Sequence, residues 1–455
     1  MSFQGGVIDP ENFTLPDGFS LYEKENAKKP DLVLSLGESL GAEGKRRFIY
    51  SNEFLVPLRS PGDYRNSMSL NEIKDEGFEL VPLDEWEHSG LGIMVDGFTP
   101  ADIGYPLVRW KFIDLTWKIE PNPALQKKIE TALADYLDTV YSEASPDLIW
   151  IGAVGDMMLQ RGIEDVLIDQ ADGKERIFSD LLPHLSGFDL LMGNLEGAVT
   201  RNGSKTPKSF NFRFRPEVLK PLGQTGFDYL SLTNNHCYDY GEEGLLDTLG
   251  YLREYGIRTS GAGTSLQEAL EPAIFSIGDS TFRILSVGAY PRERNGFDGQ
   301  FQARVSDRQA GILWYGEDAL SVIADFSEEE GIDIVMVHGG HEWQRYPDTE
   351  QRNRYRSLID AGADIVLGSH PHVLQGVEHY NGGIIYYSLG NFLFNGMEEM
   401  PYAEDSLVAS LGICGDKILY RRDIPVQIDG PYVKKDRSGR IIQQFKELSD
   451  ALKGW

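Results

Sequence analysis

The stretch LIWIGAVGD, residues 148–156, decides the fold class of this protein. In it, seven apolar or small residues run without interruption into a glycine and an aspartate. A short, continuously apolar run is typical of a strand whose sheet is covered on both faces. The alternation of such strands with helical segments predicts an α/β domain. Further runs of this kind follow along the chain at 188–193, 227–233, 332–338, 363–369 and 384–390.

The chain is long enough for two domains, because 455 residues exceed one typical hydrophobic core. Residues 146–455 form the α/β domain, and a hairpin-like pair at 273–277 and 282–287 adds antiparallel structure to it. Residues 1–145 carry short apolar runs among polar loops and end in a predicted helix at 123–141. We expect a smaller N-terminal α/β domain there, either an accessory domain or a lobe that binds a ligand.

Composition excludes several classes of protein. The 43 basic and 71 acidic residues give a net charge of −28, so no nucleic-acid partner is expected. Cys237 and Cys414 are too few for a disulfide framework or a cysteine-rich zinc site. No apolar run reaches the roughly 18 residues that a membrane span needs. The first residues lack the charged and apolar regions of a signal peptide, which is compatible with a cytoplasmic location.

Polar side chains of metal-binding type come at or just after the predicted strands. In open α/β sheets, ligands bind at the carboxyl ends of the strands, so these side chains are expected to meet at one edge. Five of the eight histidines of the chain are among them. The residues are Asp156; Asn194 and Glu196; Asn234, Asn235 and His236; His338, His341 and Glu342; His370 and His372; and Asn391.

This donor set predicts a divalent metal site. Oxygen donors mixed with imidazole and without thiolate suit Mn, Fe or Zn. The donors exceed what one tetrahedral ion needs, so we expect two ions, which can activate a water together. Asp156 and Glu196 would then take part in catalysis through the metals, with Glu196 as a bridge. His236, left off the metals, would act as the general acid.

The remaining polar residues of the edge are expected to contact the substrate: Asn194, Asn234, Glu342 and Asn391. A further candidate is the segment 210–215, in which phenylalanines alternate with polar and basic residues as in a strand. Its Arg213 and Arg215 either guide a phosphate or polycarboxylate toward the metals or form a solvated strand face.

Several motifs of the second domain, taken in order, resemble those of one known family. They are GDMML at 155–159, GNLE at 193–196, NNH at 234–236 followed by DYG, GSHPHV at 368–373 and YSLGNF at 387–392. This order resembles the CapA-type family of capsule synthesis, which is associated with poly-γ-glutamate and has a calcineurin-like metallophosphoesterase fold. The resemblance covers residues 148–395 and offers little for the N-terminal domain.

The resemblance implies a metallophosphoesterase-like four-layer sandwich, in which helices flank two mixed sheets. Two departures stand out. Met158 takes the place of the second ligand in the Asp-x-His motif of metallophosphoesterases. The His-Trp-Gly-x-Glu motif reads HGGHE at 338–342, which lacks the tryptophan and adds His341 as a candidate ligand. With His236 near the leaving group, the implied metal ligands are Asp156, Glu196, Asn235, His338, His370 and His372.

We therefore expect a phosphoesterase-like hydrolase of capsule synthesis, in which metal-activated water attacks a phosphoester or a polymer amide. The alternative is a non-catalytic assembly protein that grips an anionic polymer through its metals. A third hypothesis is that the N-terminal lobe binds a small ligand and the hydrolase domain responds. The resemblance also implies an extracytoplasmic or membrane-anchored exterior location, with membrane-associated capsule machinery as partner. The sequence gives no oligomeric state.

Overall fold

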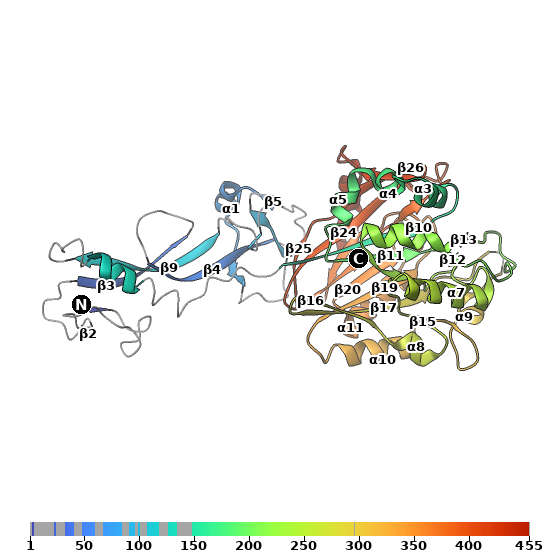
Figure 1. Ribbon diagram of the computed structural model, residues 1–455, viewed down its shortest axis with the longest axis horizontal. Helices are drawn as coiled ribbons and strands as arrows, with labels where there is room; N and C mark the ends of the chain where they lie inside the picture. The colour runs from blue at the N-terminus through green and yellow to red at the C-terminus, as the bar shows by residue number, and fades with distance from the viewer. Residues whose placement is uncertain are drawn as a thin grey trace. The chain divides into compact units, whose positions relative to one another are not determined.

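The computed structural model divides the chain into two compact units, Met1–Asp147 and Leu148–Trp455. In the second unit it describes residues 148–294 and 296–454. In the first unit it describes shorter segments: 2–3, 22–23, 32–40, 48–59, 67–83, 91–95, 99–100, 107–117 and 126–133. Figure 1 shows both units coloured by residue number.

The first unit contains a sheet in which β9 (Val108–Trp117) pairs antiparallel with both β3 (Leu32–Leu40) and β4 (Phe48–Arg59). Residues 126–133 are helical, and the rest of the helix predicted at 123–141 lies outside the described residues. The sheet order is β2-β1-β3-β9-β4-β6, with β7 also on β4. The other elements are β1 (Ser2–Phe3), β2 (Tyr22–Glu23), β5 (Ser67–Met68), α1 (Leu70–Glu76), β6 (Leu80–Pro82), β7 (Leu91–Gly92) and β8 (Met94–Val95).

The second unit is built on two main sheets. The eight-stranded sheet has the order β14-β11-β10-β24-β26-β27, with β23 also on β10 and β25 on β24. Strand β10 is parallel to β11 and β23 and antiparallel to β24, so the sheet is mixed. Its strands are β10 (Ile149–Met158), β11 (Leu190–Leu195), β14 (Phe227–Ser231), β23 (Asn391–Phe394), β24 (Asp405–Cys414), β25 (Lys417–Arg421), β26 (Ile424–Asp429) and β27 (Tyr432–Lys435).

The six-stranded sheet has the order β16-β17-β19-β20-β22-β21. Its four central strands are parallel, and β16 and β21 pair antiparallel at the edges. The hairpin predicted at 273–287 is therefore confirmed, as is the α/β class with mixed sheets. The strands are β16 (Ala273–Ile277), β17 (Ser280–Ala289), β19 (Ile332–Gly339), β20 (Ile365–Ser369), β21 (Val377–Tyr380) and β22 (Gly383–Tyr386).

Helices lie on the outer sides of the two sheets, with α3, α4 and α5 near the first and α8, α10 and α11 near the second (Figure 1). Two clusters of buried apolar side chains fill the second unit, one around β10, β11 and β14 and one around β17, β19 and β20. The helices are α3 (Ile163–Asp169), α4 (Gly173–Phe178), α5 (Leu182–Leu185), α6 (Leu219–Thr225), α7 (Gly241–Glu254), α8 (Leu266–Leu270), α9 (Gly299–Gln302), α10 (Glu317–Phe326), α11 (Thr349–Asp360) and α12 (Arg440–Ala451). Short strand pairs, β12 (Ala198–Val199) with β13 (Arg213–Phe214) and β15 (Ala262–Gly263) with β18 (Gly311–Ile312), complete it.

All six apolar runs of the second domain contain strands, but strands β10 and β22 end four residues from the ends of their runs. Strand β10 continues to Met158 because Asp156 still has strand partners, Asn194 on β11 and Asn391 on β23. Strand β22 ends at Tyr386, before the end of its apolar run. The chain then turns into β23 through Gly390, whose φ of 70° is a left-handed conformation that favours glycine.

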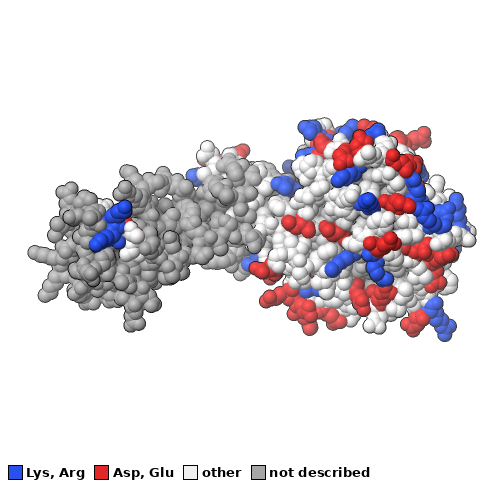
Figure 2. Space-filling view, viewed as in Figure 1, with Lys and Arg blue, Asp and Glu red and all other residues white. Residues whose placement is uncertain are grey.

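Acidic and basic side chains are interspersed on the face of the second unit that Figure 2 shows. Among the described residues, no helix is long and apolar enough to cross a membrane.

Candidate metal centre

Strands of both main sheets bring the predicted metal ligands into one buried cluster. Asp156 lies on β10 and Glu196 directly follows β11, both in the eight-stranded sheet. His338 lies on β19, and His370 and His372 follow β20, in the six-stranded sheet. One ligand atom each from Asp156, Glu196 and His338 lies within 4.8 Å of the others. All five residues are at most 5% exposed, so the cluster is inside the protein.

Asp156 is held by groups from two different segments, β11 and the turn after β20. Its Oδ1 accepts a 2.8 Å hydrogen bond from the side-chain amide of Asn194, and its Oδ2 accepts one of 3.2 Å from the backbone N–H of His370. The Nδ1 of His372 lies 3.3 Å from the same Oδ2 and 2.9 Å from Oδ1 of Asn391. These contacts fix the carboxylate and the imidazole against each other.

The imidazoles of His338 and His370 are also in contact, with 3.1 Å between His338 Nε2 and His370 Nδ1. The same Nε2 lies 2.9 Å from Oδ1 of Asn235, and His338 Nδ1 lies 2.9 Å from the hydroxyl of Ser369. His370 and His372 have φ values of 99° and 57°. Left-handed backbone costs a non-glycine residue roughly 1–3 kcal/mol and concentrates at functional sites.

Some ligand atoms of the cluster have no hydrogen-bond partner among the described residues. Both carboxylate oxygens of Glu196 and the Nε2 of His370 are buried without a hydrogen bond. A buried carboxylate without a partner is costly, because it has lost its contact with water. Oxygen and imidazole donors that converge in this way fit a divalent cation such as Mn, Fe or Zn.

The ionisation of His338 and His370 agrees with that fit. Burial, together with the neighbouring histidines, lowers the pKa of His338 and His370 well below the usual range, so both imidazoles are neutral, as metal ligands must be. Burial and the adjacent Asp156 carboxylate raise the pKa of Glu196. Against the effect of burial, Glu196 and Asp156 raise the pKa of His372 to about 10. The two carboxylates thus favour a positive charge at the imidazole of His372.

His236 lies beside the cluster and is oriented by Asp239. Its Nδ1 is 2.7 Å from Oδ2 of Asp239, and its Nε2 is 3.7 Å from Oε1 of Glu196. The Asp239 carboxylate also contacts Lys208, whose Nζ lies 2.8 Å from Oδ1. Burial and the Lys208 ammonium lower the pKa of His236, although Asp239 acts in the opposite direction. The ring can therefore exchange a proton at Nε2 while Asp239 holds Nδ1.

Residues 150–396, more than half of the chain, match the family described as bacterial capsule synthesis protein PGA_cap. The chain belongs to this capsule synthesis family. The match includes every metal-ligand candidate named above, and it confirms the resemblance predicted from the sequence motifs.

Named relatives agree with the family. The chain is 33% identical over 254 residues to PGA biosynthesis protein CapA of Bacillus subtilis, covering 55% of this chain and 64% of that protein. It is 31% identical over 253 residues to capsule biosynthesis protein CapA of Bacillus anthracis, covering 53% and 59%. The chain thus spans less than two thirds of the length of both relatives. A hypothetical protein from Thermus thermophilus matches in structure with a TM-score of 0.38 and 16% identity, over 63% of this chain and all of that one.

The segment that departs from the capsule synthesis family motif lies at the rim of the centre. The side chain of His341 is 48% exposed and lies 3.3 Å from Asp348, so the structure does not bring it to the ligand cluster. Trp343, just beyond the motif, has its ring 5.3 Å from that of His372. A tryptophan therefore does contact the centre, although it is not the one at the motif position.

The predicted substrate-binding residues fall into separate groups. Asn194 and Asn391 hold Asp156 and His372, as described above, and Asn234 donates to Oδ1 of Asn194 over 3.0 Å. These three amides therefore support the ligands. Glu342 is exposed near the centre, where its charge raises the pKa of Glu196 and His372 after the larger effects already given.

The two arginines of the basic segment differ from each other. Arg215 is engaged by α3, with its guanidinium 2.9 Å from Asp165 and 3.1 Å from Asp169. Arg213 lies over the ring of Tyr240 at 4.4 Å and has no ion pair with a described residue. Of the two, Arg213 is the one that the structure leaves available to an anion.

Sequence reasoning did not assign roles to several residues that support the centre. Lys208 was given no role, and Asp239 appeared only as part of the DYG motif. The spacing of His236 and Asp239, three residues apart, was a usable signal for the pair. Ser369 and Tyr290 carry no such signal, because their contacts with the histidines arise from strands far apart in sequence.

Proposed function

We propose that this protein is a metal-dependent hydrolase of capsule polymer synthesis. The observation that carries the proposal is the buried Glu196, whose two oxygens lack a hydrogen bond beside Asp156 and His338. Carboxylates placed in this way are stable when a cation lies between them. The arrangement of helices outside two mixed sheets supports a metallophosphoesterase-like four-layer sandwich as the scaffold.

The residues that would hold the metals are Asp156, Glu196, Asn235, His338, His370 and His372. They would hold two ions of Mn, Fe or Zn, with both oxygens of Glu196 available as ligand atoms. When bound, such ions supply an activated water and stabilise charge on the attacked phosphoryl or acyl group.

The protein's own groups then position the reaction and move its protons. His236 presents Nε2 on the side of Glu196, where it can protonate a leaving oxygen or nitrogen. Asp239 keeps the ring in that orientation through Nδ1. Asn194 and Asn391 hold Asp156 and His372 in place, in the way that groups behind metal ligands commonly do.

The substrate would be an anionic polymer or a phosphoester. The names of the relatives support a polymer of capsule type, since they refer to PGA, capsule and polyglutamine synthesis. We propose an exterior or membrane-anchored location and membrane-associated capsule machinery as partner, as expected for this family.

Metal analysis of the purified protein tests the first step. We expect one to two equivalents of Mn, Fe or Zn, and the variant His370→Ala/His372→Ala should lose them. His184→Ala, on α5 and paired with Lys435, is the matched control and should keep them. Less than a tenth of an equivalent in wild-type protein supplied with these metals would sink the proposal.

Turnover assays separate the hydrolase from the binding protein. The substrates are 4-nitrophenyl phosphate, its bis-ester and poly-γ-glutamate, each with the wild type and the double variant. We expect hydrolysis of at least one substrate, lost in the double variant. Polymer binding that is abolished by a chelator, without turnover of any substrate, would instead identify the non-catalytic assembly protein.

A further inference from the structure

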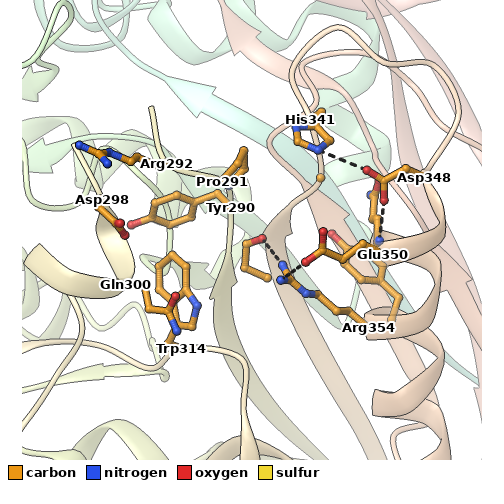
Figure 3. A pocket seen from close by; sticks show the side chains of 14 residues that line it. Tyr290, Pro291, Arg292, Asp298, Gln300, Trp314, His341, Asp348, Glu350 and Arg354 are labelled. Atoms are coloured by element: carbon orange, nitrogen blue, oxygen red, sulfur yellow. Dashed lines mark hydrogen bonds and ion pairs between the residues drawn. The ribbon is translucent and has the colours of Figure 1, made fainter. Parts of the chain in front are cut away.

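A cavity of about 280 Å³ lies next to the metal centre (Figure 3). Tyr290, which directly follows β17, forms part of its wall, and Gly340 and His341, which directly follow β19, form another part. The ring of Tyr290 lies 5.8 Å from that of His338 and 6.1 Å from that of His370. The cavity is therefore separated from two proposed metal ligands by a single aromatic ring.

The cavity combines an aromatic surface with polar groups. The rings of Tyr290 and Trp314 meet edge to face with 4.8 Å between their centroids. The hydroxyl of Tyr290 is buried and has no hydrogen-bond partner among the described residues. Small-molecule sites commonly have this composition, in which aromatic surface carries a few polar groups that fix orientation. Their volumes are roughly 300–1,000 Å³, so this cavity suits one small unit.

The charged groups on the two sides of the cavity differ in how they are paired. On the side of His341, the charged groups have partners, because Arg354 pairs with Glu350 and the imidazole of His341 contacts Asp348 (Figure 3). On the side of Tyr290 lie Arg292 and Asp298. Neither of these two forms an ion pair with any residue that the structure describes. Among the described residues, Arg292 donates from Nε to the carbonyl of Gly296 over 3.3 Å.

We propose that this cavity is a subsite for an α-amino-acid unit with a free ammonium and a free carboxylate. The guanidinium of Arg292 binds the carboxylate, and Asp298 binds the ammonium. The methylene groups of the unit lie on the rings of Tyr290 and Trp314. Such a site favours a zwitterion over a ligand with a single charge. A ligand that lacks the carboxylate leaves Arg292 without a partner, and a ligand that lacks the ammonium leaves Asp298 without one.

The inference deepens the proposed function and rests on it, because it names which part of a polymer the site takes. In a chain of glutamyl units linked through their side-chain carboxyl groups, every unit has a free α-carboxylate. Only the unit at the amino-terminal end also has a free ammonium. Arg292 and Asp298 together therefore select that end, and the bond next to it is brought to the metal centre.

Binding of glutamate to the full-length protein, with and without prior chelation, tests the subsite by calorimetry. Glutarate, which lacks the ammonium, and 4-aminobutyrate, which lacks the α-carboxylate, are the matched ligands. We expect glutamate to bind and each analogue to bind at least about tenfold more weakly, the loss typical of one charged hydrogen bond. Arg292→Met and Asp298→Asn should each weaken glutamate binding by a similar factor. Arg294→Met, on the same exposed loop but outside the cavity lining, should not.

The inference is overturned if glutamate does not bind, if glutarate binds as tightly as glutamate, or if Arg292→Met and Asp298→Asn bind like wild type. Both substitutions lie at solvent-accessible positions, so a folded protein is expected in each case. The readout is independent of metal content. If the purified protein binds glutamate but holds no metal, the hydrolase proposal is contradicted and the subsite stands. If it holds metal but does not bind glutamate, the subsite is contradicted and the hydrolase proposal stands.

Discussion

The Nζ of Lys208 lies 2.8 Å from Oδ1 of Asp239, and both side chains are completely buried. The same ammonium lies 2.8 Å from Oε1 of Glu293 and donates to the backbone carbonyl of Asn235. Asn235 and Asp239 come after β14 in the eight-stranded sheet, whereas Glu293 comes after β17 in the six-stranded sheet. The buried ammonium of Lys208 thus joins a segment of one sheet to a segment of the other. The segment after β14 carries Asn235, a proposed metal ligand, and Asp239, the partner of His236.

Lys208→Met should therefore be strongly destabilising. The substitution removes the cation from the buried carboxylate of Asp239 and from the partly buried carboxylate of Glu293. Breaking a buried ion pair in this way costs about 3–5 kcal/mol. Urea unfolding followed by circular dichroism measures the change. Lys205→Met, at an exposed position in the same loop, is the matched control and should stay within about 0.5 kcal/mol of wild type. A Lys208→Met protein as stable as the control would contradict the role given to this ammonium.

The sequence was informative about the centre wherever a ligand follows an apolar strand. Asp156 and His338 could be assigned to one edge because parallel strands place their carboxyl ends together. The order of motifs then added the family. Lys208 could not be assigned, because it lies in a loop without periodicity and its three oxygen partners come from distant positions in the chain. Its burial is a property of the folded protein.

The local sequence pattern also did not show which neighbouring residues share a site in the folded protein. His341 follows β19 as closely as a ligand would, yet its nearest charged partner is Asp348 at the start of α11. Arg215 alternates with Arg213 in sequence, but α3 offers carboxylates to Arg215 alone. Sequence spacing cannot show which neighbour competes for a side chain.

Gly155 is the position next to the centre where a side chain should be least tolerated. A Cβ there would lie 1.9 Å from the carbonyl oxygen of Gly390, which accepts the backbone N–H of Asp156. Gly155→Ala should therefore push β10 away from the segment before β23 and displace Asp156. We expect a loss of more than about 3 kcal/mol, at the upper end for overpacking, together with loss of bound metal. A variant that keeps both its stability and its metal would show that the backbone can move without cost.

Gly250, in the middle of α7, should respond in the opposite direction. Nothing lies within 4 Å of a Cβ at this position, so alanine fits without any shift. Glycine inside a helix costs roughly 0.5–1 kcal/mol relative to alanine, because the unfolded chain loses more freedom on folding. Gly250→Ala should raise the free energy of unfolding by about that amount and leave metal content unchanged. A decrease in stability would contradict the open environment of this position.

The carboxyl group of Asp364 should make stability depend on pH. Burial raises its pKa to about 7, although its carboxylate accepts the backbone N–H of Asp333 over 2.7 Å. In the unfolded chain its pKa is about 3.9. Between about pH 4 and 7, the Asp364 carboxyl therefore loses its proton in the unfolded chain but keeps it in the folded protein. The free energy of unfolding falls as the pH rises through this window.

Asp364→Asn removes the ionisation and keeps an oxygen that can accept from Asp333. The variant should gain on wild type by about 2.5 kcal/mol as the pH rises from 5 to 8, which is the part of the full linkage of about 4 kcal/mol that falls in this window. Above the folded-state pKa the gain should level off. Urea unfolding of both proteins at pH 5, 6, 7 and 8 measures the difference. If that difference is constant across the series, or grows toward acid, then the buried carboxyl does not ionise as inferred.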